Sequence, residues 1–349
     1  MYPTVIENIY RRATTLPPLL AITMLLTACS FDPIDIKLAS GWSAKSIAVW
    51  RHTRPDMIVA SRDHHYIYIS CENRASLTSP SLYLYSMKSG RSTLLISGLD
   101  RADALKTAPD GSLWIGEEVD NGLIWRITNP ERLPAELIVQ RATMRTPNPA
   151  LAPLSRAGQF AHEGIAFSHD GEYAYLPDEH RHGSLYRYQI KPPHLLEVAG
   201  NNHHWQTIID PLQARTAALK LNALQFNRME DAETLPNGHI LIAETDAPRI
   251  IEVIDHGATV EIREYLNDPR IHHPDNLAWD ESRHILWITD DDKPSILWAW
   301  DGRQLEQIAL HRDAEITGVL PFEGDILINL QGRKNGPELT LRLHETLPQ

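Results

Sequence analysis

The sequence predicts an all-β fold and, within that class, a six-bladed β-propeller. Short runs of β-branched, aromatic and leucine residues recur along the 349-residue chain, separated by turn dipeptides such as Asp110-Gly111 and Asn237-Gly238. The runs group into six units of roughly 40–50 residues with about four strands each, which is the period of propeller blades. A β-sandwich or two separate all-β domains are the alternatives, but the recurrence of one unit pattern favours the propeller.

Each unit starts with an opening motif, followed by a first strand, a turn and a second strand that ends in polar residues. The opening motifs are Pro55-Asp56-Met57, Ala102-Asp103-Ala104, His162-Glu163-Gly164, Glu230-Asp231-Ala232, Pro274-Asp275-Asn276 and Glu315-Ile316-Thr317-Gly318. The expected second strands cover residues 66–70, 112–116, 173–176, 239–243, 285–289 and 325–329. Two units are longer, with inserted loops at residues 131–159 and 191–227 and a short helix around residues 214–224. Residues 38–49 are expected to supply a closing strand that joins the two ends of the ring.

The N-terminus has the pattern of a secretory signal. Arg11 and Arg12 precede an apolar run over residues 16–28, shorter than the ~20 residues that a membrane-spanning helix needs. The tetrad Leu26-Thr27-Ala28-Cys29 at its end resembles a bacterial lipobox. The resemblance implies that Cys29 becomes a lipidated N-terminus, and Ser30 in place of Asp implies the outer membrane, facing the periplasm. An ordinary signal peptide with an incidental cysteine is the alternative.

We therefore expect a lipoprotein signal peptide at residues 1–28, a lipidated N-terminus and linker at 29–45, and a single propeller domain at 46–349. With Cys29 lipidated, Cys71 is a lone thiol in an apolar stretch, where we expect a buried and inert core residue. The net charge of −12 at pH 7 repels phosphate backbones and argues against nucleic-acid binding. Whether the protein has a protein partner in the envelope is left open.

The acidic residues of the opening motifs predict a metal site. The innermost strand of each propeller blade lines the central channel, so the opening motifs are expected to converge at one mouth of it. Their carboxylates and neutral oxygens are Asp56, Asp103, Glu163, Glu230, Asp231, Asp275, Glu315, Asn276 and Thr317. The ends of the second strands add Glu72, Glu117, Glu118, Asp178, Glu179, Glu244, Asp290, Asp291 and Asp292. So many carboxylates in one place require protons or a cation, and oxygen ligands favour calcium, with magnesium or manganese as alternatives.

A plainer interpretation is that acidic residues populate the turns between blades, since Asp and Asn favour turns for backbone reasons. The turn interpretation explains any one of these residues, whereas their recurrence at the same position in each unit favours the metal site. His162 and His273 flank opening motifs and are, with Glu118, the candidates for a catalytic role. The sequence has no Gly-x-Ser-x-Gly elbow, no Walker loop and only a weak zinc signal.

Five segments resemble, in the same order, motifs of the PhoX-type alkaline phosphatase family. They are Trp114-Ile115-Gly116-Glu117-Glu118, Phe160-Ala161-His162-Glu163-Gly164, Arg228-Met229-Glu230-Asp231, Pro274-Asp275-Asn276-Leu277 and Glu315-Ile316-Thr317-Gly318. The resemblance implies a propeller that hydrolyses phosphate monoesters with calcium and iron at its channel mouth. It implies metal ligands at Glu118, Glu163, Glu230 and Asp275, with Asn276 and Asp290 as neighbours. Gly116 stands where the family has an iron-binding cysteine, so calcium is expected and iron is not.

These observations fit three functions. The first is a PhoX-like, calcium-dependent hydrolase that acts on phosphate esters of a small molecule. The second is a non-enzymatic, lipid-anchored binding or assembly scaffold with structural calcium. The third is a calcium-dependent lactonase or esterase, because Pro274-Asp275-Asn276 also resembles the Asp-Asn pair of the gluconolactonase and paraoxonase propellers. Phosphate or vanadate should inhibit the first enzyme and leave the third unaffected.

Overall fold

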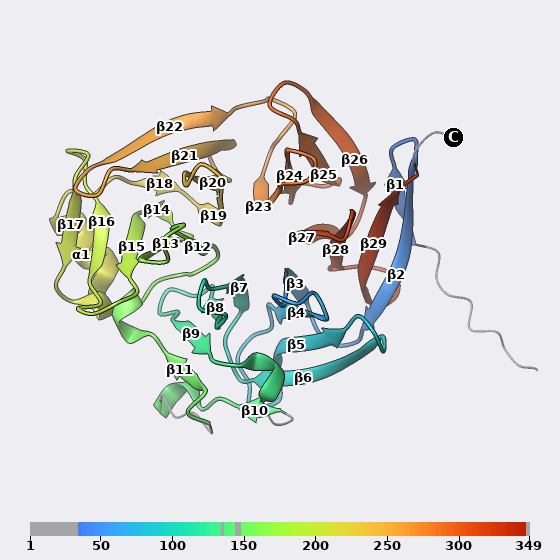
Figure 1. Ribbon diagram of the computed structural model, residues 1–349, viewed down its shortest axis with the longest axis horizontal. Coiled ribbons are helices and arrows are strands. Elements are labelled where there is room, and N and C mark those ends of the chain that lie inside the picture. Colours follow the sequence, from blue (N-terminus) through green and yellow to red (C-terminus); the bar gives the residue numbers. More distant parts are fainter. Residues whose placement is uncertain (1–33, 134–135, 144–147, 347–349) are drawn as a thin grey trace, which may run out of the picture. The chain divides into compact units, whose positions relative to one another are not determined.

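The computed structural model describes residues 34–133, 136–143 and 148–346. Within them, six sheets of four or five strands stand around a central channel, which is the six-bladed β-propeller that the sequence predicts (Figure 1). The expected signal peptide and Cys29 lie outside the described residues. No helix in the described ranges is long and apolar enough to cross a membrane.

The first three blades take their innermost strands from β3, β7 and β12. Blade 1 contains β3 (Pro55–Ala60), β4 (Tyr66–Cys71), β5 (Pro80–Ser86), β6 (Arg91–Ser97) and β10 (Leu137–Ile138). Blade 2 contains β7 (Ala102–Thr107), β8 (Leu113–Glu117), β9 (Ile124–Ile127) and β11 (Leu151–Pro153). Blade 3 contains β12 (Ala166–Phe167), β13 (Tyr173–Pro177), β15 (Leu185–Gln189), β16 (Leu196–Ala199) and β17 (Trp205–Ile208).

The last three blades begin with β19, β23 and β27. Blade 4 contains β19 (Met229–Thr234), β20 (Ile240–Glu244), β21 (Arg249–Asp255) and β22 (Val260–Leu266). Blade 5 contains β23 (Pro274–Asp280), β24 (Ile285–Asp290), β25 (Ser295–Trp300), β26 (Leu305–His311) and β1 (Ile36–Leu38). Blade 6 contains β27 (Glu315–Phe322), β28 (Asp325–Gln331), β29 (Glu338–Glu345) and β2 (Trp42–Trp50).

The ring is closed by a strand from the N-terminal side of the propeller. β2 pairs antiparallel with β29, from Trp42 opposite Glu345 to Trp50 opposite Glu338, which confirms the closing strand expected at residues 38–49. β1 adds a further strand to the outer edge of blade 5. The propeller therefore begins at Ile36, ahead of the boundary at residue 46 that the sequence suggested.

The two inserted loops are shorter than expected, because blade strands occupy part of them. β10 and β11 fall within residues 131–159, and β16 and β17 fall within residues 191–227. The remaining elements are a small sheet and short helices: β14 (Arg181–Gly183) paired with β18 (Phe226–Asn227), the 3-10 helices η1 (Pro130–Arg132), η2 (Arg141–Thr143), η3 (Ser155–Ala157) and η4 (Pro211–Gln213), and α1 (Ala214–Lys220). α1 confirms the short helix expected around residues 214–224.

Most innermost strands carry a β-bulge in the opening motif. In β3, β7, β19 and β23 the pairing register shifts directly after the first paired residue, between Pro55 and Ile58 in β3 for example. A bulge leaves residues unpaired and re-aims their side chains. Here the unpaired residues include the acidic ones, so the repeated bulge turns them toward the channel.

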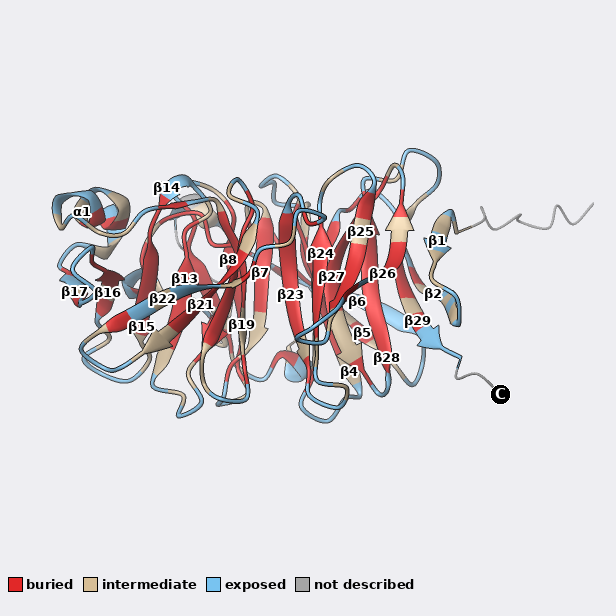
Figure 2. Ribbon diagram, turned by 90° about the horizontal axis from the view of Figure 1, so that it is seen from above, coloured by how far each residue is buried: buried red, intermediate tan, exposed pale blue. Residues whose placement is uncertain are grey.

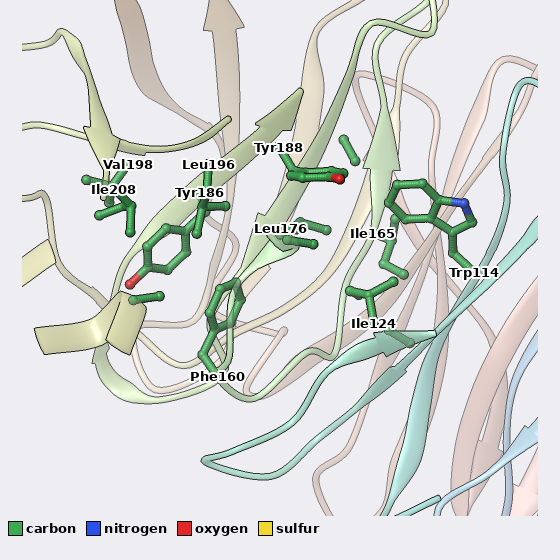
Figure 3. Packing of buried hydrophobic residues seen from close by; sticks show 14 of the residues in the cluster. Trp114, Ile124, Phe160, Ile165, Leu176, Tyr186, Tyr188, Leu196, Val198 and Ile208 are labelled. Carbon is green, nitrogen blue, oxygen red and sulfur yellow. The ribbon is translucent and has the colours of Figure 1, made fainter. Parts of the chain in front are cut away.

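Apolar side chains fill the space between neighbouring blades. The strands are buried along most of their length, and exposed residues concentrate in the turns (Figure 2). Between blades 2 and 3, Trp114 packs against Phe167 and Tyr188, and Phe160 stacks on Tyr186 (Figure 3). Trp114, Trp125, Trp287 and Trp298 are all buried strand residues. Cys71 is also buried, and burial raises the pKa of its thiol to about 12.

Candidate metal centre

A cavity of about 440 Å³ opens at the channel mouth, where the innermost strands begin. Ten carboxylates line it: Asp56, Glu72, Asp103, Glu118, Glu163, Glu230, Asp275, Asp291, Asp292 and Glu315. Four basic side chains, Arg54, Arg101, Arg228 and Lys293, and the imidazole of His273 lie among them. Residues that are far apart in the sequence thus contribute to one strongly polar chamber.

Six of the carboxylates come from equivalent positions, one in each blade. In order of blade they are Asp56, Asp103, Glu163, Glu230, Asp275 and Glu315, which we call the inner ring. The first five are buried, and Glu163, the most accessible of these, is only 9% exposed. Burying a carboxylate is costly unless a proton, a hydrogen-bond donor or a cation compensates its charge.

Three groups of three carboxylates have the spacing of cation ligands. They are Asp56, Glu72 and Asp103; Glu118, Glu163 and Glu179; and Glu163, Glu230 and Asp275. In each group the ligand oxygens lie within 4.8 Å of one another. Oxygens about 2.3–2.6 Å from one calcium ion lie at such mutual distances. Glu163 belongs to two groups, so two neighbouring cations would share it.

The group of Glu163, Glu230 and Asp275 has the least competition from basic side chains. Among the described residues, Glu163 and Asp275 form no ion pair, and the Oε2 atoms of Glu163 and Glu230 are buried without a hydrogen-bond partner. Native proteins leave few buried polar atoms unsatisfied. A cation held by these oxygens would satisfy them, so the residues present fit a hard divalent ion.

Without a cation, the inner ring favours protonated carboxylic acids. Burial, followed by the neighbouring negative charges, raises the pKa values of Asp103, Glu163, Asp275 and Glu315 well above their ordinary range. Burial likewise raises the pKa of Asp56 to about 6 and that of Glu230 to about 7. These shifts show how unfavourable several ionised carboxylates are in this space without positive charge.

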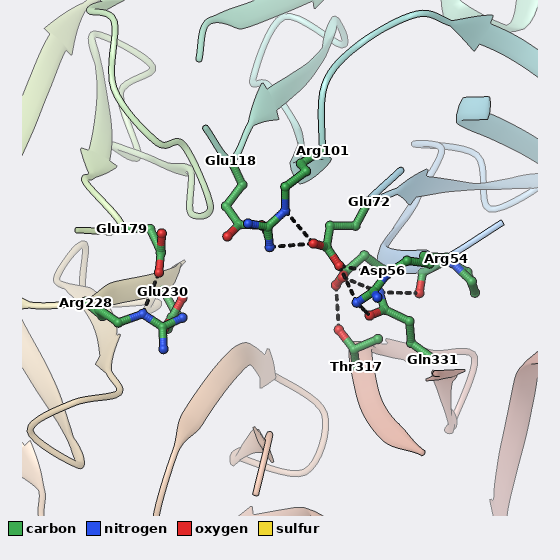
Figure 4. Close-up of polar contacts among 11 residues, drawn as sticks. Arg54, Asp56, Glu72, Arg101, Glu118, Glu179, Arg228, Glu230, Thr317 and Gln331 are labelled. Carbon is green, nitrogen blue, oxygen red and sulfur yellow. Dashed lines mark hydrogen bonds and ion pairs between the residues drawn. The ribbon is translucent and has the colours of Figure 1, made fainter. Parts of the chain in front are cut away.

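Arginines hold the carboxylates on the remaining sides of the cavity (Figure 4). Arg101 pairs with both Glu72 and Glu118, and Arg54 pairs with Glu72 from the other side. Arg228 donates to Glu179 at 2.5 Å and lies 3.1 Å from Glu230.

Sequence reasoning assigned no role to these arginines. A signal was nevertheless present, because Arg-x-Asp or Arg-x-Glu opens three of the six units: Arg54-Pro55-Asp56, Arg101-Ala102-Asp103 and Arg228-Met229-Glu230.

The structure brings four of the six expected ligands to the cavity and places two elsewhere. Glu118, Glu163, Glu230 and Asp275 line it. Asp290 instead accepts the backbone N–H groups of His272 and His273, each at 2.9 Å, so its oxygens are used in shaping the chain before β23.

Asn276 is the second expected ligand that the structure places elsewhere. Its Oδ1 accepts the Thr317 hydroxyl at 2.7 Å, and its amide donates to Asp275 at 3.0 Å. Asn276 therefore supports the ring rather than facing the cavity.

The two candidate histidines differ in position. His273 lines the cavity. His162 is fully buried, with its ring 4.0 Å from that of Phe160, and burial lowers its pKa to about 3. His162 therefore packs within the blades rather than serving the cavity.

Its packing also explains Gly116. A Cβ at that position would lie 2.7 Å from the His162 Cβ and 2.9 Å from the Ala104 Cβ, so a cysteine does not fit unless its neighbours move.

Several solved structures have a similar fold. A gluconolactonase from Xanthomonas campestris matches with a TM-score of 0.57 and 13% identity, over 88% of this chain and 91% of that chain. A luciferin-regenerating enzyme matches with a TM-score of 0.54 and 9% identity, over 87% and 95% of the two chains. A virginiamycin B lyase from Staphylococcus aureus matches with a TM-score of 0.50 and 13% identity, over 88% and 100%.

These likenesses establish the fold and nothing finer, because the identities are low. Neither a protein-family model nor a curated protein sequence matches the chain. The resemblance of five segments to the PhoX-type phosphatases therefore stays a prediction. The similar structures include a gluconolactonase, the kind of enzyme behind the third function considered from the sequence.

Proposed function

We propose that this protein is a divalent-cation-dependent hydrolase of lactones or related carboxylic esters, with its reaction at the channel mouth. The observation that carries the proposal is the group of Glu163, Glu230 and Asp275, three buried carboxylates from three blades with oxygens within 4.8 Å. An all-oxygen ligand set suits calcium. The shared fold with a gluconolactonase supports the lactone class, so this alternative now precedes the phosphate esters.

Each cavity group has a distinct part in such a reaction. A bound divalent cation would supply Lewis-acid polarisation of the substrate's carbonyl oxygen. Glu163, Glu230 and Asp275 would hold it. His273 lines the same cavity two residues before Asp275, so its imidazole is placed to take a proton from the attacking water. Glu118 suits that role less, because Arg101 pairs with its carboxylate.

Phosphate-ester hydrolysis is the second candidate. Glu163 belongs to two ligand groups, and a pair of neighbouring cations is the usual clamp for a phosphoryl group. The guanidinium groups on the cavity wall also suit phosphate oxygens. This candidate needs no thiolate at position 116 if both ions are hard cations bound by oxygens alone.

The test combines an ion count with a substrate panel. Bound ions are counted by native mass spectrometry, and a δ-lactone, an aryl acetate and an aryl phosphate are each assayed with calcium and with a chelator. Turnover of the lactone or acetate that chelation abolishes supports the proposal. Turnover of the aryl phosphate alone, inhibited by vanadate, supports the second candidate, phosphate-ester hydrolysis, instead.

Two other outcomes oppose both candidates. Bound ions without turnover of any substrate indicate a scaffold in which the cation is structural, and an absence of bound ions removes the metal centre. Glu163→Gln should lose both ion binding and turnover. Glu306→Gln, an exposed glutamate outside the cavity, is the matched control and should lose neither.

We also propose that the protein is attached to the outer membrane through a lipid on Cys29. The support is the lipobox-like tetrad Leu26-Thr27-Ala28-Cys29, followed by Ser30. Cys29→Ser should move the protein from the membrane fraction to the soluble fraction of the periplasm. An unchanged membrane fraction, or an unmodified cysteine in the mass spectrum of the mature N-terminus, would contradict the anchor.

A further inference from the structure

Arg54 and Arg101 flank Glu72 on one wall of the cavity (Figure 4). Arg54 donates through Nε and Nη2 to Glu72, at 3.1 and 2.8 Å. Arg101 donates through Nε to Glu72 at 2.5 Å and pairs through Nη2 with Glu118. Their side chains keep 50% and 28% of their surface exposed, so both still face the chamber.

These contacts do not use all the N–H donors of the two arginines. A guanidinium group has five N–H donors in a fixed planar fork. In the part of the chain that the structure describes, no hydrogen bond or ion pair uses the Nη1 atom of Arg54 or of Arg101. This wall therefore presents two arginines with unused N–H groups to the cavity, on either side of one carboxylate.

The wall formed by blades 3 to 5 has the opposite character. There, among the residues that the structure describes, Glu163 and Asp275 form no ion pair, and Arg228 lies 3.1 Å from Glu230. The arginine wall also holds a carboxylate group with cation spacing, Asp56, Glu72 and Asp103, but it combines this group with two guanidinium groups. The chamber thus joins a wall of acceptors suited to cations with a wall whose arginine donors suit an anion. Its volume of about 440 Å³ falls in the usual range for small ligands, roughly 300–1,000 Å³.

We propose that Arg54 and Arg101 bind an anionic group of the substrate, a carboxylate or a phosphate, while the cation-binding wall holds the group to be hydrolysed. The inference rests on the proposed function, because it requires a cation in the same chamber. A planar guanidinium matches the two oxygens of either anion. The substrate class is then an ester or lactone that carries negative charge.

The charge of the chamber sets the order of binding. Ten carboxylates face four basic side chains, so ionised carboxylates repel an anion until cations neutralise them. Anion binding should therefore depend on prior cation binding. If Arg54 and Arg101 only neutralise Glu72, the loaded protein should bind no anion at this wall.

The experiment measures binding of sulfate and of acetate by calorimetry, with calcium and with a chelator. Sulfate represents tetrahedral oxyanions, acetate represents carboxylates, and the tighter binder identifies the class. We expect binding with calcium alone, weakened at least tenfold by Arg101→Gln or by Arg54→Gln. Calcium affinity should stay the same or rise in these variants, because each substitution removes a positive charge from the chamber.

The outcomes separate this inference from the proposed function. Arg303→Gln, an exposed arginine outside the cavity, is the control and should bind both anions as the wild type does. Two results with calcium bound would overturn the inference and leave the proposed function standing. In the first, the arginine variants bind both anions as the wild type does; in the second, the wild type binds neither anion. If calcium itself does not bind, both are overturned. Arg54→Gln, at the more exposed side chain, decides the matter if Arg101→Gln does not fold.

Discussion

Two sets of buried carboxylates lie side by side in this propeller and have opposite surroundings. The outer set, Glu117, Asp178, Glu244 and Asp290, ends or follows the second strands and is at most 1% exposed. Five of the six inner-ring residues are buried nearly as deeply, and Glu315 is half-buried. The two sets have the same residue types and similar burial, so they differ in the hydrogen-bond partners of their carboxylates.

Every member of the outer set has hydrogen-bond donors. Arg215 of α1 binds Asp178 through two bonds of 2.7 Å, and Glu244 accepts from Arg249 at 2.7 Å. In the part of the chain that the structure describes, the inner ring contains buried oxygens without a donor, such as Oδ1 of Asp103. A buried charge with full partners stabilises the fold that positions them, whereas one without partners is retained at a cost to stability. The contrast supports the proposal that the inner ring is functional, whereas the hydrogen bonds of the outer set fit a structural role.

The largest effect is expected in the outer set. Asp178→Asn takes from the Arg215 guanidinium, whose side chain is 24% exposed, its buried carboxylate and leaves it only the exposed Asp120. We expect the free energy of unfolding to fall by about 3 kcal/mol or more, as for other broken buried pairs. Urea denaturation measures it. A loss below ~1 kcal/mol, typical of exposed pairs, would mean that the outer set is not structural.

The matching change in the inner ring should act on binding instead. Burial raises the pKa of Glu163, and Glu163→Gln replaces this acid with an amide of similar shape that cannot ionise, so the cation-free protein should be as stable as the wild type or more so. Its calcium affinity should fall by about 100-fold, the equivalent of roughly 3 kcal/mol. Calorimetry and urea denaturation test the two halves of this prediction. Destabilisation as large as that of Asp178→Asn would erase the contrast between the sets.

A third test concerns the residue before Glu117 and Glu118. Gly116→Ala places a Cβ 2.7 Å from that of His162, and overpacking of this kind typically costs about 1–3 kcal/mol. We expect a lower melting temperature with calcium binding retained, since neither glutamate is changed. An unaltered melting temperature would show that position 116 does accept a side chain.

The pH dependence of stability should report the cost of ionising the inner ring. Folding raises the inner-ring pKa values, to about 6 for Asp56 and about 7 for Glu230, from ordinary values of 3.8 and 4.5. A raised folded-state pKa contributes stability below the unfolded-state pKa, and that stability is lost as the pH rises through the folded-state value. The cation-free protein should therefore melt at a lower temperature at pH 8 than at pH 5.

Calcium supplies the control for this pH effect, because it neutralises the ionised ring. With calcium, the difference between the two melting temperatures should shrink. A cation-free protein with the same melting temperature at both pH values would contradict the assignment of an unsatisfied ring.

The repeat was visible in the sequence, because each blade opens with the same pattern and the turns between strands have strong signals. Which of two consecutive acidic residues faces the channel was not visible. Glu117 and Glu118 adjoin in the sequence, yet one binds Arg141 and the Trp125 indole while the other lines the cavity. Successive strand residues point to opposite faces, so the bulge and the strand end decide the direction.

Partners that come from other blades were equally hidden. Arg101 reaches Glu72 across 29 positions, and Thr317 reaches Asp56 across 261. Such contacts exist only after the ring has closed, so local patterns do not encode them. Asp290 and Asn276 were hidden for a different reason, because their residue types suit a metal but their oxygens are already used by neighbouring donors.

The two N-terminal strands would respond differently to mechanical load. β1 attaches to blade 5 through three residues, whereas the nine residues of β2 complete blade 6. Tension applied from the N-terminal side reaches β1 first, and its few hydrogen bonds rupture before force is transmitted to β2. We therefore expect β1 to detach first and lengthen the N-terminal segment, while β2 keeps the ring and its central chamber closed.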